Sequence, residues 1–407
     1  MKKLLILVLA CALGLTCWVA PAEGGNALGF QILNTLWDGQ SNCFVSPVSL
    51  DIALAMAACG AEGGTREEIL SALGVRDEGE IAALCPVLNA SGLKTANAAF
   101  VNERFAMKDG YVSALREKFG AELFPLGDQA RADAWVKEHT DGLIDSLPPA
   151  PENTPFMLTN AVCMDAEWYL KFENYMTNEQ AFRTPDGDVT VQMMHRYEEL
   201  YSYAENEAMQ LLCLGYRDSD LYMLLALPKD GDVRRALAWF EENGIENIAF
   251  EEQSPESIIN AILERNEKYG WSEYVSREEL EKLYPSSLPY IVNLSLPKLD
   301  LSMQNSLTAP LKSCGMVSMF DPAKADFSGI SDDRIYIEEV LQKLRVQVDE
   351  EGTRAAAVTA MMAAGAALPY AERVAVDFTC DRPFVVLIAD EASGSVCFAG
   401  VVTNPNE

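Results

Sequence analysis

The stretch EEGTRAAAVTAMMAAGAALPYAERVAVDFTCDRPF occupies residues 350–384, and its composition differs from that of the rest of the chain. The protein has 407 residues, with 61 acidic and 31 basic side chains and a formal net charge of -30. Residues 355–371 nevertheless carry no charge, and most of their side chains are small. A long uncharged run in so acidic a chain needs a structural role.

A helix, a linker or a membrane span would each account for an alanine-rich run. Alanine favours helix, but the larger side chains form only a weak helical stripe, which Gly365 and Pro369 interrupt. The run is too short and too rich in Thr, Gly and Pro to cross a bilayer. On composition alone, the run would therefore be a helix or a flexible linker.

With a period of two residues, the same run fits a strand with small side chains. One face would carry Thr353, Ala355, Ala357, Thr359, Met361 and Ala363. Gly352, immediately before it, supplies a hinge. Such a segment could lie outside the fold as a loop and later slide between two strands, because nothing on its inward face is too large or too charged to bury. This pattern predicts a conformational switch.

The N-terminal residues predict export. Lys2 and Lys3 precede an apolar run at residues 4–19 and a small-x-small cleavage site at residues 20–22, so residues 1–22 form a predicted signal peptide. We expect a secreted protein, with a lipid anchor through Cys17 or Cys11 as the alternative. Residues 23–407 contain no repeat or low-complexity tract, which predicts a single domain, and we expect it to be a monomer.

The net charge and the positions of the cysteines limit which binding partners and cofactors are expected. The strongly negative charge disfavours nucleic acid and any heparin-like polyanion. No C-x-x-C pair occurs, and the cysteines after residue 22 lie mostly in apolar runs, which indicates buried thiols rather than metal ligands or a disulfide framework. We expect no metal and no cofactor.

Local patterns predict an α+β fold. Helices are expected at residues 51–58, 111–119 and 132–147, and a further helix that ends near Gly74 is expected to begin with a capping box of Thr65 and Glu68. Strands are expected at residues 95–102, 157–168, 189–194, 209–215, 221–227, 291–296, 335–348, 374–378, 384–389 and 396–402. Residues 245–287 are acidic and polar, with a capping box at Ser276 and Glu279. We interpret them as a solvated helical insertion rather than a second core.

Sequence motifs of the common enzyme classes are absent. The chain contains no G-x-S-x-G, H-E-x-x-H, P-loop or G-x-G-x-x-G. Its two histidines, His139 and His195, are interpreted as surface or packing residues. We expect no enzymatic activity, and an uncharacterised exported hydrolase is a remote alternative.

Four segments, in order along the chain, resemble one family, the serpins. Residues 42–50 (NCFVSPVSL) resemble its N-x-F-x-S-P-x-S motif, and residues 320–331 (FDPAKADFSGIS) resemble its F-D-P-S-K-A-D-F-S-G-I motif. Residues 348–357 (VDEEGTRAAA) resemble its inhibitory hinge, and residues 381–405 resemble its C-terminal segment. The resemblance covers essentially the whole chain after the signal peptide, and the combination of motifs is highly specific.

The resemblance implies a serpin fold of three β-sheets and about nine helices, with residues 350–373 as an exposed reactive-centre loop. It implies a metastable suicide-substrate inhibitor: a serine protease attacks the loop, forms an acyl-enzyme and is trapped when the cut loop inserts into the central sheet. The implied hinge comprises Glu350, Gly352, Thr353, Ala355, Ala356 and Ala357. Its small uncharged residues favour an inhibitor; a non-inhibitory serpin acting as a protease substrate or binding protein is the alternative.

Other residues carry over from the family by position. The resemblance pairs Glu350 with Lys298 at the top of the central sheet and packs Trp168 beside them, a region called the breach. A polar cluster midway down the sheet, the shutter, would comprise Ser46, Ser49, Asn160 and Gln342. The family usually has histidine at the last position, and because glutamine does not ionise near neutral pH, we expect any pH dependence tied to that histidine to be missing. Without the resemblance, each position would indicate only ordinary structure.

The family's spacing from Glu350 places the scissile bond between Ala366 and Ala367. A small residue before the bond fits a shallow specificity pocket, which predicts an elastase-like or subtilisin-like serine protease joined covalently through Ala366. Counting back from Pro383 would instead place the bond near Glu372. Further candidate cut sites are Met362, Leu368, Tyr370 and Arg373.

Overall fold

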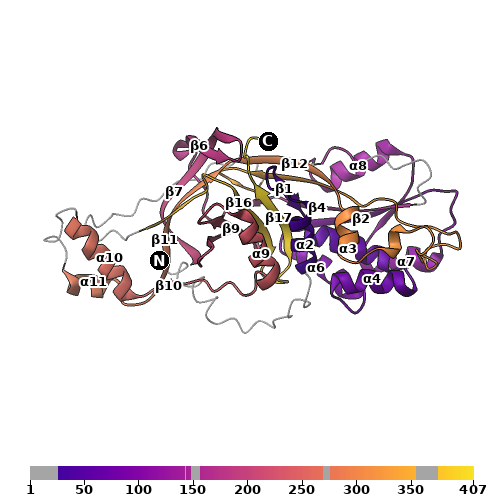
Figure 1. Cartoon of the computed structure of the whole chain (residues 1–407), viewed down its shortest axis with the longest axis horizontal. Helices are drawn as coiled ribbons and strands as arrows, with labels where there is room; N and C mark the ends of the chain where they lie inside the picture. Colours follow the sequence, from indigo (N-terminus) through magenta and orange to yellow (C-terminus); the bar gives the residue numbers. More distant parts are fainter. Residues whose placement is uncertain (1–25, 143, 148–155, 269–275, 354–374) are drawn as a thin grey trace.

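The computed structural model describes residues 26–142, 144–147, 156–268, 276–353 and 375–407 (Figure 1). Many of the helices come from the first third of the chain and gather at one end of the molecule. The helices are α2 (Ala27–Leu36), α3 (Pro47–Ala58), α4 (Gly63–Leu73), α5 (Gly79–Ala82), α6 (Leu84–Ala90), α7 (Asp109–Phe119), α8 (Gln129–His139), α9 (Val233–Asn243), α10 (Pro255–Lys268), α11 (Arg277–Leu283) and α12 (Thr308–Ser313), with 3-10 turns η1 (Asn174–Met176) and η2 (Ser318–Phe320).

Ten strands form one continuous hydrogen-bonded assembly. Its path is β1-β17-β16-β9-β8-β7-β11-β10, with β6 on β7 and β15 on β11. The strands are β1 (Cys43–Val45), β6 (Asn178–Thr184), β7 (Gly187–Glu205), β8 (Met209–Gly215), β9 (Leu221–Pro228), β10 (Glu252–Gln253), β11 (Leu288–Pro297), β15 (Val376–Thr379), β16 (Phe384–Asp390) and β17 (Val396–Val402). The long β7 belongs to two sheets, because residues 193–201 pair with β11 and residues 202–205 pair with β8.

The central sheet consists of two parts that share only a short junction. One part is β3-β2-β4 and the other is β12-β13-β14-β5. Their strands are β2 (Leu93–Val101), β3 (Glu122–Pro125), β4 (Phe156–Met164), β5 (Ala166–Glu167), β12 (Leu299–Ser306), β13 (Leu341–Val348) and β14 (Gly352–Thr353). Because β5 follows β4 after a single residue, the parts meet at β5-β14-β13. Within the described ranges, no pairing joins β4 to β13 below this junction.

The main core lies between the helices and the buried strands. β16 and β17 are buried at every residue, because α2, α3 and α9 pack against this part of the sheet. α3 is buried along nearly its whole length, and Ser46 caps its first turn by accepting a hydrogen bond from the Ser49 N–H. Five of the eight cysteines in the described part of the chain are buried, as expected from their apolar surroundings. No helix among the described residues is long and apolar enough to cross a membrane.

Three expectations about where helices and strands begin or end are wrong. The helix expected to reach residue 147 ends at His139, because Asp141 and Gly142 both have positive φ. The capping box at Thr65 does not form: Glu68 instead accepts hydrogen bonds from the backbone N–H groups of Val317 and Ser318. The strand expected from residue 335 begins at Leu341.

The acidic insertion at residues 245–287 differs in part from the expected solvated excursion. The capping box of Ser276 and Glu279 is present and begins α11. α10 and α11 pack on each other around a small hydrophobic cluster of their own, formed by Ile258, Ile259, Ile262, Leu280 and Tyr284. The pair projects from the end of the molecule that carries β11 (Figure 1). The insertion is therefore a helical arm with a minor core, and most of its acidic side chains are exposed.

A buried carboxylate joins three of the helices. Glu78, at the start of α5, is 7% exposed and forms ion pairs with Arg66 of α4 at 2.6 Å and with Lys118 of α7 at 2.8 Å. Burial disfavours the charged carboxylate, but the hydrogen bonds from these side chains outweigh it and lower the pKa of Glu78 to about 2. The ion pairs thus fasten the helical end of the molecule.

We predict that Glu78→Gln lowers the free energy of unfolding by about 1–3 kcal/mol at pH 7. The folded-state pKa lies below the unfolded value of about 4.3, so the stabilisation is complete above that value and is lost as the pH falls toward 2. Urea unfolding midpoints of the two proteins should therefore converge in acid. Glu80→Gln, which removes a pair with the exposed Arg76, is the control. Equal midpoints at pH 7 for Glu78→Gln and wild type would contradict the assignment.

Candidate functional site

Residues 349–353, which we call the hinge turn, follow β13 and are tightly fixed. Val348 of β13 pairs with Thr353, while Gly352 and Thr353 pair on their other side with Glu167 and Ala166 of β5. A Cβ atom on Gly352 would lie 2.1 Å from the Ala166 carbonyl oxygen, so only glycine fits this position. Two residues of the predicted loop therefore already occupy a strand position within the central sheet.

The carboxylate of Glu350 is held at the base of this turn. Its Oε2 lies 2.6 Å from Lys298 Nζ, and its Oε1 accepts a 2.8 Å hydrogen bond from the Thr177 hydroxyl. Glu350 is only 5% exposed; burial opposes its charge, but these donors outweigh it and lower the pKa. The structure thus brings together the two residues that the sequence paired. Thr177 was missed because nothing in its local sequence marks it.

Trp168 is buried next to the hinge turn and is hydrogen-bonded to it. It is 1% exposed, its indole N–H donates to the Asp349 carbonyl at 2.8 Å, and its ring stacks on Tyr216 at 4.7 Å. The Tyr216 and Thr353 hydroxyl oxygens are 2.6 Å apart, so the first loop residue on the inward face is also hydrogen-bonded. Sequence reasoning missed Tyr216, because contacts this distant in the sequence leave no local pattern.

The expected shutter residues fall into two groups. Gln342 and Ser46 are directly bonded: the Gln342 side-chain carbonyl accepts the Ser46 N–H at 3.0 Å, and its amide donates to the Ser46 carbonyl at 2.9 Å. Ser49 joins them through its backbone N–H, which donates to Ser46 Oγ. Asn160 instead donates to Asn97 on β2 at 2.7 Å, and its own Oδ1 is buried with no hydrogen-bond partner among the described residues.

The remaining predicted positions lie outside the described residues. These are the hinge residues Ala355, Ala356 and Ala357, the bond between Ala366 and Ala367, and the other candidate cut sites Met362, Leu368, Tyr370, Glu372 and Arg373. The two histidines make structural contacts: His195 Nδ1 lies 2.9 Å from Ser295 Oγ, and His139 Nδ1 lies 2.9 Å from the Trp135 carbonyl oxygen.

Comparison with known proteins identifies the family. The model of the family "Serpin (serine protease inhibitor)" matches residues 23–405, so the chain belongs to the serpins. It is 30% identical over 401 residues to TK1782 of Thermococcus kodakarensis, an uncharacterized serpin-like protein, covering 94% of this chain and 85% of the relative. It is also 30% identical to human leukocyte elastase inhibitor, covering 89% and 93%.

A solved structure agrees with this assignment. Human thyroxine-binding globulin in complex with thyroxine superimposes with a TM-score of 0.72 at 23% identity, covering 95% of this chain and 99% of the globulin. At this identity the likeness concerns the fold. The resemblance inferred from the four sequence segments, and the α+β serpin fold with three sheets that it implied, are confirmed.

We predict that Gln342→Leu destabilises the protein through Ser46. Leucine leaves the buried Ser46 N–H without its acceptor, whereas the Ser46 carbonyl still receives the Leu50 N–H. An orphaned buried donor costs about 1–3 kcal/mol, which should appear as a lower denaturant midpoint. Gln304→Leu, at an exposed position on the neighbouring β12, should leave the midpoint nearly unchanged. If both variants behave alike, the Gln342 hydrogen bonds have no special role.

Proposed function

We propose that this protein is an irreversible suicide-substrate inhibitor of serine proteases, with an elastase-like or subtilisin-like target that cuts between Ala366 and Ala367. The observation that supports this most strongly is the placement of β14. Gly352 and Thr353 occupy a strand position between β5 and β13, at the top of two strands, β4 and β13, that are not paired with each other in the described residues. A strand that continued from Thr353 would run into the space between them.

Strand insertion would supply the driving force. β4 and β13 each present a row of backbone groups that a new antiparallel strand could satisfy on both of its edges. At roughly 0.5–1.5 kcal/mol net for each hydrogen bond, such a strand would gain on the order of 10 kcal/mol. In an inserted strand, the side chains that would face inward after Thr353 begin with Ala355 and Ala357, which are small enough to enter without repacking.

The proposed chemistry uses the protease's own mechanism. Its serine oxygen attacks the Ala366 carbonyl carbon, the Ala366–Ala367 peptide bond breaks, and the new amino group of Ala367 leaves with a proton. Ala366 then remains attached to the protease as an ester. Water would normally hydrolyse that ester, so inhibition depends on insertion occurring faster than hydrolysis. The inhibitor contributes the loop and the sheet and no catalytic group.

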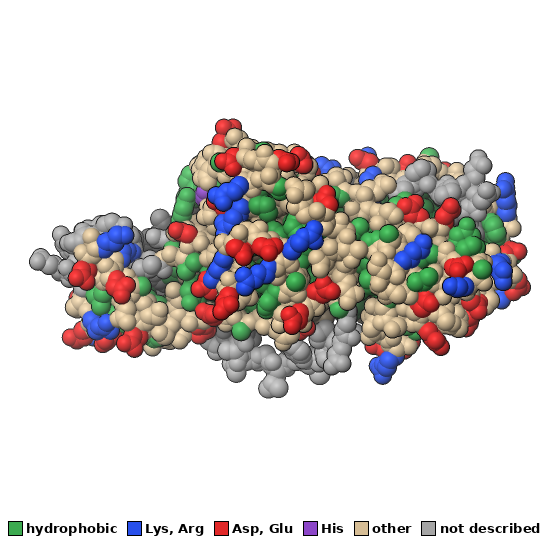
Figure 2. All heavy atoms as spheres, in the orientation of Figure 1, with side chains coloured by type: hydrophobic (Ala, Val, Ile, Leu, Met, Phe, Trp, Pro, Cys, Tyr) green, Lys and Arg blue, Asp and Glu red, His purple; other side chains and the backbone are tan. Residues whose placement is uncertain are grey.

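The proposal also covers where the protein acts and which cofactor it needs. We propose that the signal peptide at residues 1–22 exports the protein, and that it acts as a secreted monomer. The face shown in Figure 2 carries acidic and basic side chains intermingled, without an extended basic tract. Together with the net charge of -30, this supports inhibition that needs no polyanion cofactor.

We expect the protein to form a complex with an elastase-like or subtilisin-like protease that survives boiling in detergent, and to release a peptide that begins at Ala367. Trypsin- and chymotrypsin-like proteases serve as comparisons. Clean cleavage by every protease without a complex would contradict inhibition and favour a protease substrate or a binding protein. Hydrolysis of a small substrate by the protein itself would instead favour an enzyme.

Thr353→Arg should convert the inhibitor into a substrate. Thr353 is 5% exposed and bonded to Tyr216, so arginine would place an unpaired charge where the strand begins. The displaced strand start would slow insertion relative to hydrolysis. The covalent complex should decrease at least about tenfold, as expected if burying the charge adds about 1.4 kcal/mol or more to the insertion barrier. Thr190→Arg, at an exposed position on β7, is the matched control. Equal complex yields from both variants would contradict insertion through Thr353.

A further inference from the structure

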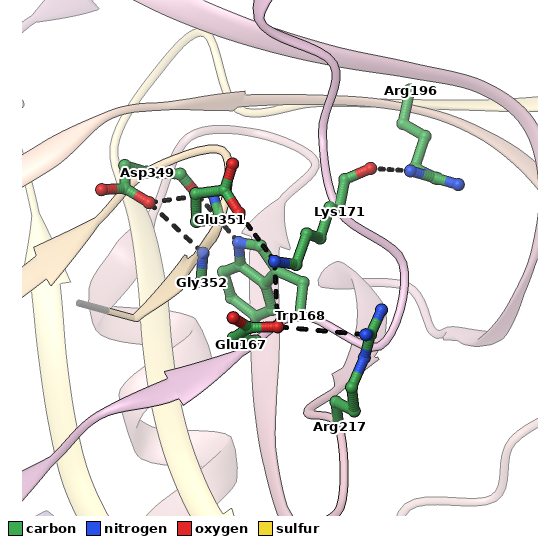
Figure 3. Close-up of polar contacts among 8 residues, drawn as sticks. All are labelled: Glu167, Trp168, Lys171, Arg196, Arg217, Asp349, Glu351 and Gly352. Carbon is green, nitrogen blue, oxygen red and sulfur yellow. Dashed lines mark hydrogen bonds and ion pairs between the residues drawn. The ribbon is translucent and has the colours of Figure 1, made fainter. Parts of the chain in front are cut away.

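We infer that Lys171 is a positioning residue that clasps the hinge turn to the end of β5 and thereby favours loop insertion over ester hydrolysis. This inference rests on the proposed function, because it concerns the step that decides between inhibition and cleavage. Figure 3 shows the Lys171 amine between the carboxylates of Glu351, in the hinge turn, and Glu167, at the end of β5. We refer to these three residues as the clasp.

The amine lies within ion-pair distance of both carboxylates. Lys171 Nζ is 2.7 Å from Glu351 Oε2 and 2.9 Å from Glu167 Oε2, and its side chain is only 18% exposed. The hydrogen bonds to Glu351 and Glu167 raise the pKa of Lys171, so the ammonium form persists well above neutral pH. Arg217 adds a weaker contact, 4.0 Å from Glu167. The clasp therefore bridges the two chain segments that meet at β14.

The backbone around Lys171 is itself fixed against the hinge. The N–H groups of Trp168 and Phe172 donate to the carbonyls of Glu351 and Glu350 at 2.9 and 3.0 Å. Arg196, which lies on β7, donates from its guanidinium to the Lys171 carbonyl. The other terminal nitrogen of Arg196 pairs with Glu199 at 3.0 Å. Lys171 thus projects from a segment that is anchored on both sides, which lowers the entropy cost of holding its amine in place.

Without the amine, the same junction would contain a repulsion between carboxylates that only the weaker contact of Arg217 with Glu167 would offset. Gly352 pairs with Glu167, and Glu351 immediately precedes Gly352, so two carboxylates meet where the new strand begins. Lys298 does not relieve this repulsion, because its amine is paired separately with the neighbouring Glu350 at 2.6 Å. Lys171 converts a like-charge contact that would push the hinge away from β5 into an attractive bridge.

The clasp lies ahead, in the sequence, of the segment that is proposed to insert, so its ion pairs do not have to break during insertion. Its hinge partner, Glu351, lies ahead of Gly352 and Thr353, which already occupy their strand positions. Insertion then extends an existing strand, and the cost of starting a new one has already been met. Loss of the clasp would let the hinge leave the sheet, so that insertion would have to begin again while water attacks the ester.

The test measures inhibition by the Lys171→Met variant and by the wild type, using the protease that forms the covalent complex. We expect the ratio of inhibitor cleaved to inhibitor trapped to rise about three- to tenfold, the range for losing one partly buried ion pair. The rate at which the protease first attacks the loop should stay unchanged. Lys171→Arg should restore wild-type behaviour, and Lys229→Met, which removes a separate ion pair with Glu205, should have no effect. A purely structural loss would change the rate of first attack as well as the ratio of inhibitor cleaved to inhibitor trapped.

A double-mutant cycle identifies the partner. Glu351→Gln alone should raise the ratio, and Lys171→Met combined with Glu351→Gln should add little to either single variant. Fully additive effects would show that Lys171 does not act through Glu351 and would overturn the inference.

A second measurement separates the clasp from the proposed function. Each protein is cut in its loop by a non-target protease, and the rate of insertion is followed by tryptophan fluorescence, since Trp168 lies beneath the hinge. Insertion by wild type with slower insertion by Lys171→Met supports both proposals. Equal rates, or faster insertion by the variant, overturn the clasp alone. A cut wild-type chain that does not insert overturns the proposed function and, with it, the clasp.

Discussion

The close approach of Gly352 to β5 is the constraint on which the rest of the site depends. The backbone at this residue passes so near the Ala166 carbonyl oxygen that no side chain fits, and this proximity lets Gly352 and Thr353 pair with β5 on one side and β13 on the other. The contacts of the breach hold this short strand in place. Trp168 supports it from below, and the two adjacent glutamates, Glu350 and Glu351, are bound by separate lysines.

The strand is fixed at a place where the sheet is otherwise incomplete. β4 and β13 share a junction through β14 but are not paired below it in the described residues, and Asn160 of β4 leaves a buried oxygen without a donor. Unsatisfied buried groups cost free energy, and an added strand would pair the backbone groups at the facing edges of β4 and β13. The molecule thus combines a tightly anchored strand start with two strand edges that further pairing could satisfy, which is what the proposed insertion requires.

The sequence was sufficient for the family and for several contacts, because these depend on motifs with fixed spacing. Glu350 and Lys298, and Ser46 and Gln342, lie together as the resemblance implied. Partners that depend on tertiary packing were not predictable. Tyr216 and Lys171 belong to no motif, and Glu68 lost its expected local cap to a distant turn at Val317. The minor core of α10 and α11 was missed because its few isoleucines lie among many acidic residues.

Hydrogen exchange of the intact and loop-cleaved protein tests the central claim most directly. Amides of β4 and β13 that face each other should exchange readily in the intact protein and become strongly protected after cleavage, together with amides of residues 354–366. The short strand at Gly352 and Thr353 should be protected in both states. Unchanged exchange in β4, β13 and residues 354–366 after cleavage would show that no strand is added to the central sheet, and would contradict the account.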